Sequence, residues 1–386
     1  MKILHVLADS DPAKGGVIEG VLQLGEAYRR LGHEQHLLTL DDPRDPWVGS
    51  TASPIFPLGK PGATKRFYPA RAIAWLRAHA EQYDAIVVDG LWNAATLAAA
   101  RVLPQSGVPY AVFPHGMLDP WFRELQPAKE WVKRQLFRVN EGPLLRGAKA
   151  VLFTTERERE LARATWPGWQ GMREQVVGFG TGEPPSTTNA EILDFRSGVV
   201  GLADARYLLF LSRIHPKKGC ELLLEGFANA HQGERTHLVI AGPGAPDYLA
   251  RLHRLSDNLG ISSKVHWPGM LQSGVKWAAL NGCEAMVLTS YQENFGVVVA
   301  EALACRKPVL ISDQVNIHDA VAQARAGFIC ETTAASVADK LCLLKNLTAR
   351  ERGEMGLRGR ELYERGFSMD EVARRVLVAL CDEPIG

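Results

Sequence analysis

Two glutamates stand close together where a predicted strand gives way to a predicted helix. The stretch Ser290–Gly296 places Glu293 in a turn, and the apolar run Val297–Ala304 carries Glu301. A helix that begins here leaves its first amides free for an anion, and Glu301 lies about 7 to 8 Å along it. This spacing suits a sugar nucleotide, with phosphate on the first amides, ribose at Glu301 and the donor sugar at Glu293. Glutamates are often merely solvated, but Glu301 lies in a largely apolar helix, which favours a binding role for its charge.

A second charged group follows the predicted strand Tyr207–Leu211. Arg213 and Lys218 lie in the loop that leads to the next helix, which opens near Gly219. Arginine offers a planar fork and lysine a point charge, and both can neutralise a diphosphate leaving group. Basic residues in a loop are usually only solvated. Their position three βα units before the glutamate motif, and one unit before Ala241-Gly-Pro-Gly244, makes the signal more specific.

The elements that would position these residues alternate along the chain. The 386 residues are too many for one ordinary core, and short apolar runs alternate with amphipathic ones, as in doubly wound parallel sheets. Residues 41–66 are predicted to be the longest loop, and residues 181–188 to be a linker. We expect the first-half strands at 3–8, 36–40, 85–88, 110–113, 150–153 and 175–177, and the second-half strands at 207–211, 238–240, 265–267, 286–288 and 309–311.

Composition excludes several classes of protein. Hydrophobic content of 46% and charged content of 23% are typical of globular chains, and a net charge of +1 argues against a dedicated nucleic-acid binder. The six cysteines have no C-x-x-C spacing and are expected to be reduced core residues. The first apolar run is too short for a signal peptide, and no run approaches a membrane span. We therefore expect a cytoplasmic protein.

With these motifs the chain resembles glycosyltransferase family 4. The resemblance rests on the glycine turn Gly15-Gly16, the Arg213–Gly219 stretch, Val239-Ile-Ala-Gly-Pro-Gly244, Val265-His-Trp-Pro-Gly269 and the glutamate pair. It implies a GT-B fold: residues 1–185 form an acceptor domain, residues 186–367 form a nucleotide-sugar domain, and a helix within 368–386 crosses back onto the first. The two Rossmann-like domains then face a central cleft. The segment Pro114–Trp121 is similar to enzymes that build bacterial exopolysaccharides.

The resemblance also assigns roles. Arg213 and Lys218 bind the diphosphate, although the adjacent Lys217 leaves open which lysine does so, and His115 lies beside the donor sugar. The expected catalytic residues are His115, Arg213, Lys218 and Glu293. The expected substrate-binding residues are Gly15, Gly16, Arg213, Lys218, Gly269, Met270, Leu271, Glu293, Asn294, Phe295, Gly296, Val297 and Glu301, with the 268–271 loop at the base.

The stretch 121–138 combines basic and aromatic residues. Such a helix can lie on anionic lipid or hold a lipid-linked acceptor, or it can be an ordinary packed amphipathic helix, and the sequence leaves both open. We expect any membrane contact to be peripheral, at the inner face.

The sequence thus predicts a retaining, metal-independent hexosyltransferase. It would use a UDP-sugar, first of all UDP-glucose, with GDP-mannose left open, and a saccharide or lipid-linked acceptor; no cofactor or nucleic acid is expected. No D-x-D motif that could hold a divalent metal is evident in the sequence. Arg213, Lys218 and the helix amides would therefore neutralise the negative charge of the diphosphate. The alternatives are a nucleotide-sugar epimerase of GT-B fold, which consumes no acceptor, and a non-catalytic nucleotide-sugar-binding protein.

Overall fold

The computed structural model describes residues 1–12, 15–60, 69–120, 127–166, 168–203, 205–230 and 235–381, without the side chains of 127–129 and 273. The parts of the predicted helices at 121–126 and beyond 381 lie outside this description. The chain divides into two compact units. Unit 1 comprises Met1–Gly182 and the segment from Met369, and unit 2 is Glu183–Ser368. Within the described ranges no helix is both long and apolar enough to cross a bilayer.

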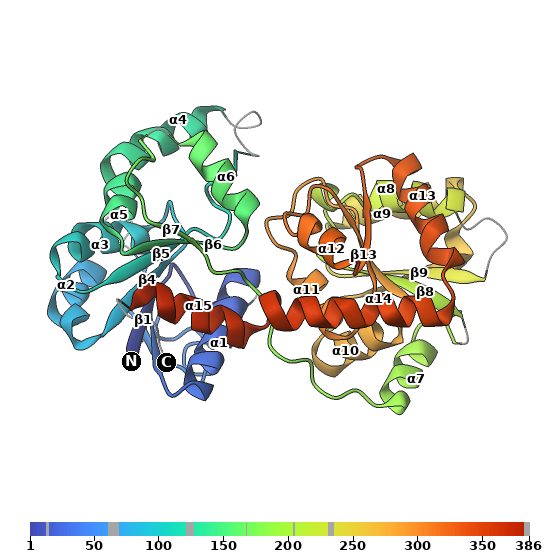
Figure 1. Ribbon diagram of the computed structural model, residues 1–386, viewed down its shortest axis with the longest axis horizontal. Coiled ribbons are helices and arrows are strands. Elements are labelled where there is room, and N and C mark those ends of the chain that lie inside the picture. The colour runs from blue at the N-terminus through green and yellow to red at the C-terminus, as the bar shows by residue number, and fades with distance from the viewer. Residues whose placement is uncertain are drawn as a thin grey trace. The chain divides into compact units, whose positions relative to one another are not determined.

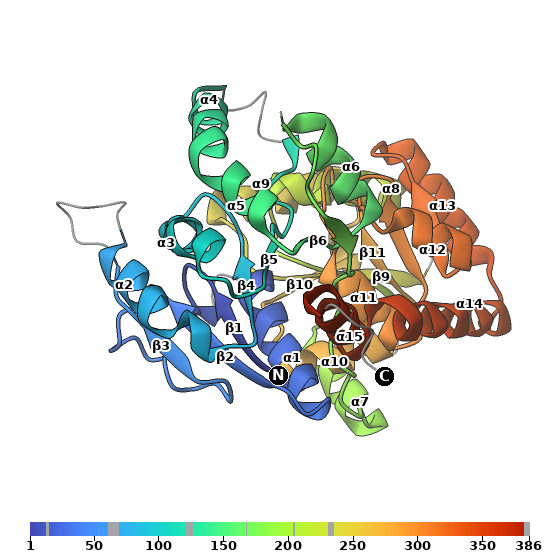
Figure 2. The same cartoon turned by 60° about the vertical axis from the view of Figure 1, so that its left-hand side comes forward.

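Unit 1 is built around a seven-stranded parallel sheet of order β3-β2-β1-β4-β5-β6-β7, of which Figure 1 labels β1 and β4 to β7 and Figure 2 labels β2 and β3. Its strands are β1 Lys2–Val6, β2 Glu34–Thr39, β3 Ile55–Pro57, β4 Ala85–Asp89, β5 Tyr110–Phe113, β6 Ala150–Phe153 and β7 Glu174–Val176. Its helices are α1 Gly16–Arg30, α2 Ala70–His79, α3 Ala94–Val102, α4 Pro127–Leu136, α5 Gly142–Gly147, α6 Glu156–Thr165 and α15 Met369–Leu380, with short turns η3 Ala80–Gln82 and η4 Leu103–Gln105 and a π-helix η6 Phe137–Glu141.

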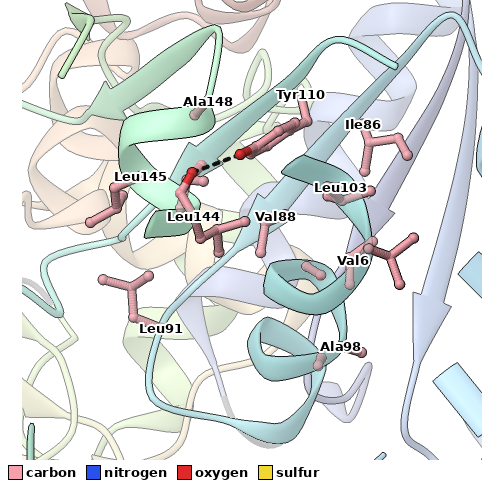
Figure 3. Packing of buried hydrophobic residues seen from close by; sticks show 14 of the residues in the cluster. Val6, Ile86, Val88, Leu91, Ala98, Leu103, Tyr110, Leu144, Leu145 and Ala148 are labelled. Carbon is pink, nitrogen blue, oxygen red and sulfur yellow. Dashed lines mark hydrogen bonds between the residues drawn. The ribbon is translucent and has the colours of Figure 1, made fainter. Parts of the chain in front are cut away.

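The core of unit 1 lies between the sheet and the helices on its face. Figure 3 shows side chains of β1, β4 and β5 meeting those of α3 and α5, among them Val6, Val88 and Leu144. Tyr110 is buried there, and its hydroxyl donates to the Leu144 carbonyl oxygen at 2.9 Å, which satisfies a polar group that would otherwise be costly to bury.

The helix α15 returns from unit 2 to pack on unit 1. It lies beside α1 (Figure 1), where the Arg30 guanidinium meets the Asp370 carboxylate at 2.5 Å and the Met369 amide donates to the Thr181 carbonyl at 3.0 Å. Its apolar face is buried, as the spacing of Val372 and Val376 in the sequence predicts. The predicted pair of doubly wound domains with a returning C-terminal helix is confirmed.

Unit 2 contains a six-stranded parallel sheet of order β10-β9-β8-β11-β12-β13. Its strands are β8 Arg206–Leu211, β9 Thr236–Ala241, β10 Val265–Gly269, β11 Ala285–Leu288, β12 Val309–Ser312 and β13 Gly327–Cys330. Its helices are α7 Asn189–Gly198, α8 Cys220–Ala230, α9 Pro246–Asn258, α10 Ser273–Gly282, α11 Val297–Ala304, α12 His318–Ala324, α13 Ala334–Asn346 and α14 Ala349–Leu362, with short turns η7 Pro216–Lys218 and η8 Ser262–Lys264 and a π-helix η9 Tyr363–Phe367.

Two local predictions need correction. The segment expected to be one long loop, 41–66, contains the edge strand β3, whose main chain pairs with Leu37–Thr39 although it ends on a proline. Proline is tolerated there because an edge strand leaves one side of its backbone unpaired. The first strand spans Lys2–Val6 rather than 3–8, and the edge strand β13 was not predicted at all.

Candidate functional site

The sheet of unit 2 has its topological switch point between β8 and β11. From β8 the chain runs to β9 on one side, and it returns to β11 on the other. In open α/β sheets ligands bind outside the carboxyl ends of the strands at such a point, because the loops there diverge. The loops 212–219 and 289–296, which carry the two charged motifs, flank this switch point.

The two loops are joined by side-chain and main-chain contacts. The Lys218 ammonium is ion-paired with the Glu293 carboxylate, and both side chains are largely buried. The Tyr291 amide donates to the Lys217 carbonyl at 2.8 Å, and the Thr289 hydroxyl donates to the carbonyl of Gly219 at 2.9 Å. Lys217 and Lys218 therefore differ in setting, since it is Lys218 that pairs with the predicted sugar-binding glutamate.

Gly219 makes this approach of the two loops possible. Its φ of 65° is left-handed, and a Cβ built on it would stand 2.1 Å from the Thr289 carbonyl oxygen. Only glycine fits without displacing one of the loops.

The Glu293 turn is also held from the β12 side. The Glu293 amide donates to the Gln314 carbonyl at 3.0 Å, and the Asn316 amide donates to the Glu293 carbonyl at 3.0 Å. Gly296, with a φ of 78°, is the N-cap residue of α11, and as a glycine it has no side chain with which to cap that N-terminus. The first amides of α11 therefore form a helix terminus of the kind that binds anions. The Phe295 side chain is buried against Phe367, so it packs rather than faces a ligand.

Glu301 has a partner that the sequence did not suggest. Its side chain is 9% exposed, and its carboxylate accepts from the Lys276 ammonium of α10 at 2.7 Å. Lys276 also stands over the Trp277 ring, 4.4 Å from its centroid. Lys276 was missed because α10 follows a different strand from α11, and no local pattern links it to the glutamate.

Arg213 has a different environment. It is exposed, just after β8, and within the described ranges it forms no ion pair. Its guanidinium is therefore available to an incoming anion at the same sheet edge as Lys218.

The predicted base loop borders a cavity of about 490 Å³ between α7 and the start of α10. Leu271 and Pro268 line it, with Phe195 and Val275 opposite, so its wall is mainly apolar. Gly269 and Met270 are not among its lining residues, and Met270 is exposed. The Gly269 φ of 76° turns the chain at the end of β10.

In unit 1 the predicted His115 is held by a buried carboxylate. Its Nε2 lies 2.8 Å from Asp89 Oδ1, and Asp89 Oδ2 lies 2.7 Å from Nδ1 of His5. Burial alone would raise the pKa of Asp89, but the charge of His5 and hydrogen bonds from both imidazoles hold it below its usual range. Neither Asp89 nor His5 was singled out as a site residue. The sequence signal that could have found them is a histidine, His5, inside an apolar strand and an acid, Asp89, at the end of another.

Gly15 and Gly16 lie at the open N-terminus of α1, at the end of the loop that follows β1. Gly15 has a φ of 90°, and a Cβ on either residue would meet no atom of the described part of the chain within 4 Å. Both glycines lie in unit 1, whereas the Lys218 and Glu293 loops lie in unit 2.

The arrangement in unit 2 can bind a polyhydroxylated anion. Its cations and the free helix amides suit phosphate oxygens, while its carboxylates suit hydroxyl groups. Among the described residues no group of three or more His, Cys, Asp or Glu is placed to hold a metal ion.

Comparison with known proteins covers both units. The family model described as "Glycosyl transferase 4-like domain" matches residues 15–180, and the one described as "Glycosyl transferases group 1" matches residues 198–361. D-inositol 3-phosphate glycosyltransferase 2 of Catenulispora acidiphila is 36% identical over 137 residues, 33% of this chain and 32% of that protein. A D-inositol 3-phosphate glycosyltransferase of Stackebrandtia nassauensis is 27% identical over 304 residues, 72% of this chain and 67% of that protein. The aligned segments span about a third of the length of the first curated relatives that the chain matches.

Solved structures resemble the whole chain. Anabaena HepE in complex with UDP-glucose superposes with a TM-score of 0.77 at 19% identity, covering 98% of this chain and 99% of that one. Sucrose-phosphate synthase from Thermosynechococcus elongatus gives a TM-score of 0.78 at 21% identity, covering 98% and 97%. These likenesses concern the fold, and the GT-B fold predicted from the sequence is confirmed.

Proposed function

Because the chain belongs to glycosyltransferase family 4, we propose that it transfers a hexose from a nucleoside diphosphate sugar to a saccharide or lipid-linked acceptor. The observation that carries the proposal is the meeting of Lys218 and Glu293 across the switch point of the unit 2 sheet, beside the uncapped N-terminus of α11. Ligands of α/β sheets bind at this kind of place, and these groups complement a diphosphate and a sugar.

The ion pairs are compatible with donor binding. An ammonium has three N–H donors, so Lys218 can keep Glu293 and also donate to a phosphate oxygen. A carboxylate accepts at about four lone-pair positions, so the contact with Lys276 leaves Glu301 able to accept from ribose hydroxyls. In this proposal Arg213 supplies a second, exposed cation to the diphosphate.

The proposed chemistry is retaining and needs no metal. As the bond from sugar to phosphate breaks, negative charge grows on the diphosphate, and Arg213, Lys218 and the α11 amides neutralise it. The acceptor approaches on the face that the leaving group departs from, so positioning and electrostatics replace a strong base.

UDP-glucose is the proposed donor, supported by the solved HepE complex with that ligand, and GDP-mannose is the alternative. A thermal-shift panel of nucleoside diphosphates and nucleotide sugars tests this choice. A ligand at 100 times its dissociation constant stabilises the folded protein by about 2.7 kcal/mol. Lys218→Ala should reduce the shift without abolishing it, because most of the effect of Lys218 is expected on charge that develops during transfer, while the matched variant Lys217→Ala should keep nearly all of it. No shift with any nucleotide would refute the proposal, and isomerised donor without acceptor use would make the protein an epimerase.

We also propose a cytoplasmic location and peripheral contact with the inner face of a membrane through α4 and η6, in line with six cysteines that are all free thiols. Figure 2 shows α4 projecting from the rest of unit 1. Trp131 is 64% and Val139 71% exposed, and the exposed cation Arg138 belongs to the same helical segment. Exposed apolar groups beside cations suit anionic lipid.

Co-sedimentation with vesicles tests the membrane contact. The chain should bind phosphatidylglycerol vesicles more strongly than phosphatidylcholine vesicles, and a Trp131→Ser, Val139→Ser double variant should lose binding. A matched double variant on the exposed side chains Leu343 and Leu357 of unit 2 should bind normally. Equal binding of wild type and the first double variant would refute the contact.

A further inference from the structure

Three buried side chains from three neighbouring segments form one hydrogen-bonded chain in unit 1. His5 lies on β1, Asp89 ends β4, and His115 follows β5. Each carboxylate oxygen of Asp89 serves one imidazole, Oδ2 at 2.7 Å from His5 and Oδ1 at 2.8 Å from His115. The three side chains are respectively 0%, 1% and 4% exposed. So little exposure means that the contacts are made inside the protein and are not screened by water.

The backbone at His115 is in a conformation that its side chain must help to hold. Its φ is 51°, a strained left-handed value that a non-glycine residue keeps only where the surrounding contacts hold it. The imidazole is stacked on Phe113, with 4.1 Å between ring centroids, and meets Phe179 edge-on at 5.7 Å. The next amide, that of Gly116, donates to the buried carboxylate of Glu158 at 2.6 Å. The turn is therefore anchored from two sides.

The carboxylate also dictates where the protons lie. An ionised carboxylate only accepts hydrogen bonds, so His115 must carry a proton on Nε2 and His5 must carry one on Nδ1. The Nε2 of His5 has no hydrogen-bond partner among the described residues. The only hydrogen bond described for the His5 side chain is therefore the one to Asp89.

We propose that His5 and Asp89 are positioning residues for His115: they fix its tautomer and its left-handed turn at the carboxyl edge of the sheet in unit 1. This rests on the proposed function and on the role that the family resemblance gives His115, beside the donor sugar. The imidazole is nearly buried and its Nε2–H is engaged, so it does not act as a mobile acid or base. Loss of this support should leave donor binding nearly unchanged and lower turnover, because a misplaced His115 matters most in the transition state.

Two substitutions of His5 separate positioning from packing. His5→Asn keeps an N–H donor near the place of Nδ1 but leaves a cavity, whereas His5→Phe fills the space and removes the donor. If His5 only packs, the phenylalanine variant is the better one. If His5 positions Asp89, the asparagine variant keeps more activity than the phenylalanine variant, even though it is the less stable. His36→Phe is the matched control, because His36 is also a buried strand histidine, bonded instead to Tyr83.

The assay is UDP release from UDP-glucose, together with nitrogen-15 NMR of the histidines in the ligand-free protein. We expect His5→Phe and Asp89→Asn to lower kcat by about 10- to 100-fold, as when other carboxylate supports of imidazoles are removed, with KM changed less than about threefold. Wild-type His115 should carry its proton on Nε2. A wild-type kcat in His5→Phe, or a His115 protonated on Nδ1 alone, would overturn the inference. Absence of any UDP release by the wild type would instead overturn UDP-glucose as the donor, and the NMR result would still decide the positioning.

Discussion

The close approach of the two site loops makes a quantitative prediction for Gly219→Ala. An alanine Cβ at this position would stand 2.1 Å from the Thr289 carbonyl oxygen, so the loops must separate by about 1 Å. The left-handed backbone adds about 1 to 2 kcal/mol of strain, and overpacking adds about 1 to 3 kcal/mol. We therefore expect Gly219→Ala to lower the free energy of unfolding by about 2 to 5 kcal/mol.

The matched control is Gly260→Ala in the same unit. Gly260 has nearly the same φ, 68° against 65°, but a Cβ there meets nothing within 4 Å. This variant isolates the backbone strain, so we expect a loss of only about 1 to 2 kcal/mol. The difference between the two variants then measures the clash with Thr289.

Urea unfolding followed by tryptophan fluorescence gives the stabilities, and UDP-glucose turnover gives the consequence for function. A displacement of about 1 Å at Lys218 is expected to lower kcat by about 100-fold in Gly219→Ala. Gly260→Ala should retain wild-type kcat. Equal stability losses in the two variants, or an active Gly219→Ala enzyme, would show that the loops do not meet as described.

Four further predictions concern charge. Lys218→Ala and Arg213→Ala should each lower kcat by about 10² to 10³ with a smaller rise in KM, because most of their effect is on developing charge; steady-state kinetics showing only a KM effect would contradict this. Glu301→Ala should weaken UDP binding by about 1.5 to 3 kcal/mol in calorimetry, since a charged acceptor for the ribose is lost, and an unchanged affinity would remove it from the site. Turnover should survive EDTA, because side chains neutralise the diphosphate; loss restored by magnesium or manganese would reveal a metal requirement. Burial raises the pKa of Glu141 in η6, because the folded protein favours its protonated form. The contribution of Glu141 to the free energy of unfolding is therefore lost as pH rises through that raised pKa. Glu141→Gln should therefore gain stability relative to wild type as pH rises above the ordinary glutamate value of 4.5 in urea titrations, and a gap that does not change with pH would refute this.

The sequence predicted the elements that local patterns encode. Charged residues and glycines directly after apolar strands, such as Arg213 and Gly219, mark the carboxyl ends where α/β sheets bind ligands. The apolar face of α15 was visible from its own periodicity, because a helix buries one stripe wherever it docks.

Contacts between distant segments could not be predicted. Lys276 and Glu301 belong to different βα units, and nothing near either residue signals the other. His115 was expected to lie beside the donor sugar, and this stays a prediction; nothing near it in the sequence signals its contact with Asp89, which depends on the pairing of β4 with β5. The edge strand β3 was missed because proline and glycine around it outweighed its short apolar run.

The return of α15 to unit 1 has a consequence for protein synthesis. Residues 1–182 leave the ribosome first, but the helix that covers α1 follows only after all of residues 183–368. At about 5 to 20 residues per second, that delay lasts about 10 to 40 s. During this time the nascent first unit exposes the apolar surface that Val372, Val376 and Leu377 later cover. Unit 2 is contiguous in the chain, so it can finish folding while the unit that precedes it still lacks its last helix.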